Sequence, residues 1–120
     1  MPILALHHIQ LAMPRGDENR ARVFYGGVLG FEEVPKPEEL AGRGGVWFRA
    51  GTAEVHLGIE DDFVPAKKAH PALLVDDLPA VVQACEAAGH PTEEGKPLKG
   101  YVRADVHDPF GNRIELLQRL

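Results

Sequence analysis

The segment that decides the fold is DPFGNRIEL, residues 108–116, in which a turn runs directly into a strand. Its first five residues are Asp, Pro, Phe, Gly and Asn, a composition typical of a tight turn. The strand that follows continues to Gln118 and has Ile114 and Leu116 on one face. Because side chains alternate across a strand, Glu115 lies on the opposite face. Residues 101–107 also have strand character, so two strands are expected on either side of this turn.

Upstream of this pair of strands, the sequence predicts a strand and a helix. Residues 70–75 are strand-like, and a helix then begins after Asp76 or Asp77, with Pro79 in its first turn and Gly89 at its end. The helix has an apolar stripe made of Leu78, Val81, Val82, Cys85 and Ala88. The buried side of this helix is expected to cover one face of the sheet, with Cys85 in the core.

The same order of elements occurs in the first half of the chain. A strand over residues 5–13 precedes a helix that runs from an N-cap at Asp17 to Gly30, and strands follow at 31–34, 46–50 and 53–59, with a loop over 38–45. His8 aligns with His70, and residues 55–57 align with 114–116. The halves therefore predict an α+β fold of two βαβββ modules, about 3–60 and 69–120, which form a curved mixed sheet, or cup, with the helices outside.

Composition limits the possible functions. With 120 residues, 44% hydrophobic and 26% charged, the chain is typical of one globular domain. Its net charge of −5, without a basic block, disfavours nucleic-acid binding. No apolar run approaches the roughly 20 residues that span a membrane, and the N-terminus lacks the features of a signal peptide. Cys85 is the single cysteine, so we expect a cytoplasmic protein that binds a small molecule.

The six histidines are numerous for such a short acidic chain. Alternation in the first strand places His8, Gln10 and Ala12 on one face, and His7 on the other face with the apolar residues Ile9, Leu11 and Met13. In the strand over 53–59, the same alternation places His56 on the face opposite Val55 and Leu57. His70 begins its strand on the face of Ala72. If the modules are related by a two-fold axis, the four residues that meet are His8, His56, His70 and Glu115. Three imidazoles and a carboxylate are ligands that suit Zn, Ni or Fe.

Four further side chains are candidates for substrate binding. Gln10 shares a face with His8. Trp47 and its neighbour Phe48 each either line the cup or fill the core. Tyr101 and Arg103 lie on an alternating polar set, from which Arg103 either clamps a substrate carboxylate or stays exposed. Of the four metal candidates, Glu115 is also the candidate catalytic base.

These segments resemble the vicinal oxygen chelate superfamily, which includes glyoxalase I, extradiol dioxygenases and bleomycin-resistance proteins. The matching pieces are residues 8–12, 24–25 with 29–31, 55–57, 70–77 and 108–116, in the order that the superfamily has. The resemblance implies paired modules that form a cup and a divalent metal held by both modules. The chain is similar to glyoxalase I at His8, His70 and Glu115, and it differs at His56, where glyoxalase I has a second Glu.

The leading expectation is a metal-dependent lyase or isomerase that acts on a small vicinally oxygenated molecule. The metal would stabilise the oxyanion left when a proton is abstracted. The alternatives are an extradiol-type Fe(II) dioxygenase and a metal-free protein that sequesters a drug. The resemblance to short glyoxalase-like chains also implies a homodimer, in which His8 and His56 of one subunit meet His70 and Glu115 of the other.

Overall fold

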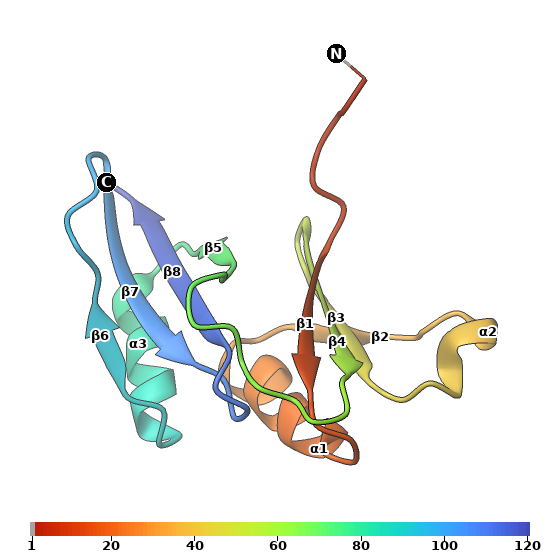
Figure 1. Cartoon of the computed structure of the whole chain (residues 1–120). Helices are drawn as coiled ribbons and strands as arrows, with labels where there is room; N and C mark the ends of the chain where they lie inside the picture. The colour runs from red at the N-terminus through yellow and green to blue at the C-terminus, as the bar shows by residue number, and fades with distance from the viewer. Residues whose placement is uncertain (1) are drawn as a thin grey trace.

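The computed structural model describes residues 2–120, and it confirms two βαβββ modules (Figure 1). The first module consists of β1 (Ile9–Met13), α1 (Glu18–Ala21), η1 (Arg22–Val28), β2 (Glu32–Val34), α2 (Glu38–Ala41), β3 (Val46–Ala50) and β4 (Ala53–Ile59). The second consists of β5 (Ala72–Leu74), α3 (Leu78–Ala87), β6 (Thr92–Glu94), β7 (Tyr101–His107) and β8 (Arg113–Arg119).

The two modules have the same sheet topology. The strand order is β1-β4-β3-β2 in the first sheet and β5-β8-β7-β6 in the second. In each sheet the first strand of the module pairs in parallel with the last, and the other neighbours are antiparallel. Within residues 2–120 no strand of one sheet pairs with a strand of the other, so a single chain forms two separate sheets rather than one continuous cup (Figure 1).

The helices begin partly as the sequence predicts. Asp77, rather than Asp76, caps α3, since its carboxylate accepts a hydrogen bond of 3.1 Å from the amide of Ala80. Asp17 does not cap the first helix with its side chain; its carboxylate pairs with Arg20 at 3.2 Å instead. That helix continues as the π-helical segment η1, which buries Phe24 and Tyr25.

Several elements differ in extent from the prediction. The expected strand over 5–13 begins only at Ile9, where pairing with β4 starts at Val55, and the preceding segment rises away from the first sheet (Figure 1). Its apolar side chains Ile3, Leu4 and Leu6 are exposed. The strand expected over 70–75 is reduced to Ala72–Leu74, and the expected loop over 38–45 contains the short helix α2.

The core lies between the helices and one face of each sheet. Its largest fully buried side chains include Tyr25, Phe24, Phe48 and Met13, and Cys85 is buried as expected. The opposite, polar face of each sheet carries no helix of its own and holds the candidate site residues. Among residues 2–120, no helix is both long and apolar enough to cross a membrane.

Candidate functional site

The polar face of the first sheet is built around His56. In the strand register His56 lies between Gln10 of β1 and Trp47 of β3. The Trp47 ring stacks on His56 with centroids 3.8 Å apart and planes 3° apart, and the His8 ring stacks on its other side at 4.1 Å and 17°. Trp47 is therefore part of the polar face, whereas Phe48 is buried in the core.

His56 is buried and held at one nitrogen by Glu54. Its Nε2 lies 3.0 Å from Oε1 of Glu54, and Oε2 of the same carboxylate lies 3.7 Å from Nη2 of Arg49. Burial lowers the pKa of His56, although the hydrogen bond to Glu54 opposes this shift. The same hydrogen bond lowers the pKa of Glu54. His56 is thus held as a neutral ring between two aromatic neighbours, with Nδ1 as its free nitrogen.

The polar face of the second sheet joins His70 to Glu115. His70 Nδ1 lies 2.7 Å from the carbonyl oxygen of Lys68, and its Nε2 lies 3.0 Å from Oε1 of Glu115. Because a carbonyl oxygen only accepts, Nδ1 carries the proton of that bond. In the neutral ring Nε2 then presents a lone pair towards the carboxylate. The contact is a hydrogen bond when a proton lies between the two atoms, and without that proton the nitrogen and the oxygen can both serve as ligands of one cation.

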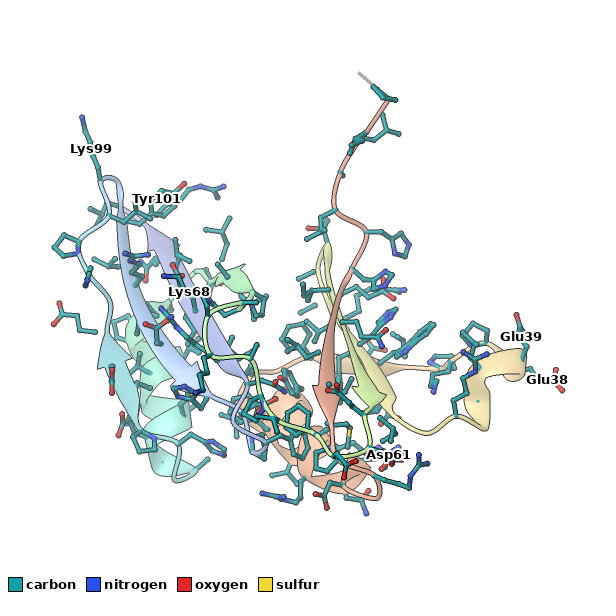
Figure 2. All side chains as sticks on the ribbon, in the orientation of Figure 1. Glu38, Glu39, Asp61, Lys68, Lys99 and Tyr101 are labelled. Carbon is teal, nitrogen blue, oxygen red and sulfur yellow. The ribbon has the colours of Figure 1, made fainter. Side chains whose placement is uncertain are left out.

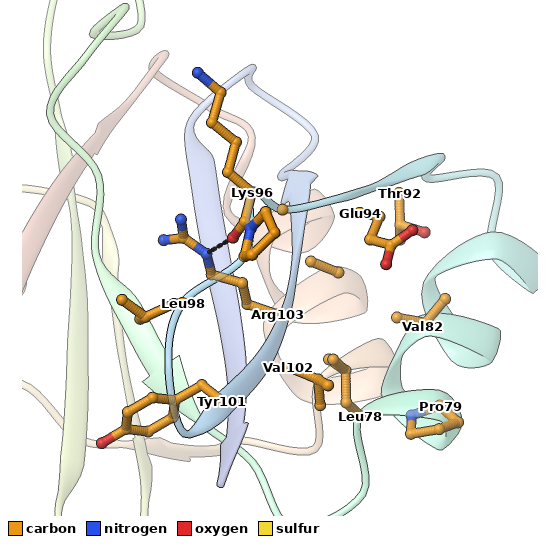
Figure 3. Close-up of a pocket in the computed structure, with 13 residues that line it drawn as sticks. Leu78, Pro79, Val82, Thr92, Glu94, Lys96, Leu98, Tyr101, Val102 and Arg103 are labelled. Carbon is orange, nitrogen blue, oxygen red and sulfur yellow. Dashed lines mark hydrogen bonds between the residues drawn. The ribbon is translucent and has the colours of Figure 1, made fainter. Parts of the chain in front are cut away.

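Arg103 holds the other oxygen of Glu115. Its Nη1 donates to Oε2 of Glu115 at 3.0 Å and its Nε donates to the carbonyl of Lys96 at 2.8 Å (Figure 3). The side chain passes over Gly95, where an added Cβ would lie 2.7 Å from Cγ of Arg103. Burial raises the pKa of Glu115, but the hydrogen bonds from His70 and Arg103 and the charge of Arg103 outweigh it, so the pKa is lowered. Arg103 is therefore partnered by Glu115 rather than free.

The remaining candidate, Tyr101, begins β7 and lines a cavity that Arg103 also lines. It is close to Lys99 at the end of β7 that is remote from the turn at 108–112 (Figure 2). Together with Leu98 and Val102 it lines a cavity of about 530 Å³ that extends to α3 (Figure 3). The contacts of Tyr101 thus belong to the edge of the second module.

Within residues 2–120, no three His, Cys, Asp or Glu side chains lie close enough to hold one metal ion. The four predicted ligands form two pairs, His8 with His56 on the first sheet and His70 with Glu115 on the second. One chain thus provides two half-sites.

The sequence model of the Glyoxalase/Bleomycin resistance protein/Dioxygenase superfamily matches residues 5–116. The chain belongs to this superfamily. A glyoxalase family protein from Bacillus anthracis is 44% identical, with a TM-score of 0.93 over 98% of this chain and 97% of that one. Among curated proteins there is no match.

Two more distant solved structures share the fold. The fosfomycin resistance protein FosX from Listeria monocytogenes is 17% identical, with a TM-score of 0.78 over 98% of this chain and 95% of that one. The antibiotic binding protein TnmS3 from Streptomyces sp. CB03234 is 22% identical, with a TM-score of 0.74 over 100% and 99%.

The donor chemistry of the second half-site fits the divalent metal that this superfamily commonly uses. The carbonyl of Lys68 fixes the tautomer of His70, as outer-shell carbonyls do for metal-bound histidines. The first half-site fits less directly, because metal coordination takes place in the plane of an imidazole ring. The stacked rings of His8 and His56 direct their nitrogens along nearly parallel lines, so His8 must turn to share an ion with His56.

The sequence analysis missed the joint between the modules. The turn at 108–112 supplies Asp108, which accepts a hydrogen bond of 2.7 Å from the hydroxyl of Tyr25, and Asn112, which donates to the carbonyl of Ala12 at 2.8 Å. The sequence did contain two hints of this joint: Tyr25 lies on the apolar side of the first helix, and the turn at 108–112 is rich in polar residues. Their hydrogen bond could not be predicted, because the two residues are far apart in the sequence.

Proposed function

We propose that this glyoxalase-superfamily protein is a metal-dependent lyase or isomerase that acts on a small vicinally oxygenated molecule. The observation that carries the proposal is the contact of His70 with Glu115, in which Nε2 and a carboxylate oxygen, both common metal-ligand atoms, lie 3.0 Å apart. Their outer atoms are already held by Lys68 and Arg103. Such a preorganised pair suits a divalent cation.

The proposed metal ligands are His8, His56, His70 and Glu115, and Zn, Ni or Fe suits this set. When bound, the ion would act as a Lewis acid that stabilises an oxyanion on the substrate. Glu115 is the proposed base, since Arg103 helps to keep it ionised at neutral pH. On the first sheet, Trp47 would form an apolar wall against the substrate and Gln10 would donate hydrogen bonds to it.

The proposed working unit is a homodimer in which each site is shared. Each chain leaves the polar faces of both sheets without a covering helix and leaves Ile3, Leu4 and Leu6 exposed beside the first strand. A second copy related by a two-fold axis would bring the half-site of one first module to the half-site of the other second module. We propose the cytoplasm as its location, in agreement with the free and buried Cys85.

Two observations favour other functions. Because Glu54 occupies Nε2 of His56, the set His8, His70 and Glu115 resembles the two-histidine, one-carboxylate arrangement of Fe(II) oxygenases, which supports an extradiol-type dioxygenase. The stack of Trp47, His56 and His8 instead offers a flat aromatic surface, which supports a metal-free protein that sequesters a drug. TnmS3, an antibiotic binding protein, has the same fold.

Metal analysis of the purified protein separates these functions. The protein is prepared without chelator, affinity nickel or a histidine tag, and its metal content is measured. Nickel or zinc supports the lyase, iron the dioxygenase, and no metal above background the binding protein. His70→Ala and Glu115→Gln should each lower the metal content at least tenfold, whereas His107→Ala, an exposed histidine of the same sheet, should not. Equal metal in all variants would contradict a site at His70 and Glu115.

A further inference from the structure

A cavity of about 240 Å³ adjoins the His56 half-site on the polar face of the first module. Its lining includes Gln10 of β1, Trp47 of β3 and Gly58 of β4, together with Lys36 and Arg43, which flank α2. Trp47 lines the cavity and also stacks on His56. The cavity and the half-site are therefore parts of one continuous surface.

The charge of this cavity is positive. Lys36 donates from its ammonium group to the carbonyl oxygen of Gly44. Neither Lys36 nor Arg43 lies within ion-pair distance of a carboxylate in the described part of the chain, in contrast to Arg22, Arg49 and Arg103. No acidic side chain is part of the lining that the described residues provide. The Glu18 carboxylate accepts a hydrogen bond of 3.4 Å from the amide of Gly45 next to the cavity but is not part of its lining. Two cations thus border a cavity that no carboxylate of residues 2–120 lines.

Gln10 adds a polar group to the floor of the cavity. A Cβ built on Gly58 would lie 2.4 Å from Nε2 of Gln10, so the amide lies directly over the glycine. Among residues 2–120 the Gln10 side chain has no hydrogen-bond partner. The absence of a side chain at Gly58 therefore lets Gln10 lie flat, with its amide donor open to a ligand.

The register of β4 sets the distance from the half-site. Gly58 follows His56 by two residues on the same face, which corresponds to about 7 Å along a strand. A molecule that places its oxygenated end at His56 would therefore extend about that far along β4 to reach the Gln10 amide over Gly58.

We propose that this cavity binds the anionic group of the substrate, through Lys36, Arg43 and the amide of Gln10. The substrate class is then a small acid, with a carboxylate, phosphonate or phosphate at the end remote from its vicinal oxygens. This inference rests on the proposed function for the position of the oxygenated end. Binding of the anion itself requires no metal.

The anion site is tested in protein freed of metal by a chelator that is then removed by dialysis. Trp47 is the only tryptophan of the chain, so its fluorescence reports on the cavity. Inorganic phosphate and, separately, glutarate are titrated at constant ionic strength. We expect a saturable fluorescence change with at least one of them. Tighter binding of phosphate would identify a phosphate or phosphonate substrate, and tighter binding of glutarate a carboxylate substrate.

Variants show whether the change comes from this cavity. Lys36→Ala and Arg43→Ala should each weaken binding at least tenfold, and Arg43→Lys should weaken it less than Arg43→Ala. Arg119→Ala removes an arginine without a carboxylate partner on the second module and should have no effect. Gly58→Ala, which displaces Gln10, should also weaken binding. Far-ultraviolet circular dichroism confirms that each variant is folded.

Two results would overturn the proposal: no saturable change with either anion, or an equal loss of affinity in Arg119→Ala. Neither result depends on bound metal, so a failure of the anion site is distinguishable from a failure of the metal site at His70 and Glu115.

Discussion

The hydroxyl of Tyr25 in the first module donates a hydrogen bond of 2.7 Å to the carboxylate of Asp108 in the second. Both residues are buried, and burial raises the pKa of Tyr25 well above its usual value. Asp108 also accepts hydrogen bonds from Asn112, whose amide reaches the backbone of Ala12. This network fixes the two modules to each other at the base of both sheets.

Removal of the Tyr25 hydroxyl should destabilise the protein. In Tyr25→Phe, Oδ2 of Asp108 keeps only the Asn112 amide as a donor. A buried hydrogen bond to a charged group contributes about 1.5–3 kcal/mol, so we expect a decrease of about 2 kcal/mol in the free energy of unfolding. Urea denaturation measures it. Tyr101→Phe, at the edge of the second module, should change stability by less than about 0.5 kcal/mol. Equal effects of the two variants would contradict the role of the joint.

Loss of Arg103 should raise the pKa of Glu115. Arg103 donates a hydrogen bond to this carboxylate and supplies the nearest fixed positive charge. Arg103→Met keeps much of the aliphatic chain and removes both effects, so the carboxylate should titrate at higher pH than in the wild type. Carbon-13 NMR of labelled glutamate in metal-free protein measures this. Arg22→Met, which breaks an exposed pair with Glu33 on the first module, should leave the Glu115 titration nearly unchanged.

The depressed pKa of His56 should make the metal-free protein less stable in mild acid. The folded state favours the neutral ring, so the unfolded state binds more protons as the pH falls below the unfolded value of about 6.5. The stabilisation is complete above that pH and is lost as the pH falls towards the pKa of the folded state. Urea denaturation at pH 7.5 and 5.5 measures the loss.

His56→Phe keeps a ring against Trp47 and should reduce this pH dependence. Exposed His107 serves as the control, since His107→Gln should retain the slope of the wild type. If the slope is the same in His56→Phe as in the wild type, groups other than His56 account for it.

Shared sites predict complementation between two inactive variants. His8→Ala and Glu115→Ala homodimers should each bind metal poorly. The two chains are then unfolded, mixed and refolded together. In a mixed dimer with shared sites, one site contains both substitutions and the other site contains neither. Mixed dimers should therefore bind about one ion tightly, as an expected stoichiometry for two-fold symmetry. If a tagged and purified mixed dimer fails to bind metal, sites shared between subunits are excluded.

The sequence predicted which side chains share a face, because alternation along a strand is a local property. His8 with Gln10, and Glu115 opposite Ile114, follow from it directly. It could not predict that Arg103 pairs with Glu115, since Asp105 is the residue directly opposite Glu115 in the register and the contact depends on the path of a long side chain over Gly95.

The position of one module relative to the other could not be predicted from the sequence either, because it depends on contacts between distant residues. The two half-sites stand on separate sheets because the chain docks its modules through the joint of Tyr25 and Asp108, which are far apart in sequence. The strand that was expected to begin at Ala5 begins at Ile9 for a related reason. A strand extends only as far as it has a neighbour, and in the described chain β4 ends its pairing with β1 at Val55.

The parallel pairing of β1 with β4 also dictates the order of events while the chain is being synthesised. Ile9 pairs with Val55 and Met13 pairs with Ile59, so the first strand to leave the ribosome is without its partner until most of the module has been translated. The antiparallel strands β2, β3 and β4 are close together in sequence and can associate earlier. In the second module, β5 likewise has no partner until β8, the last strand of that module, has been translated. Each module thus completes its sheet with the strand that was translated first.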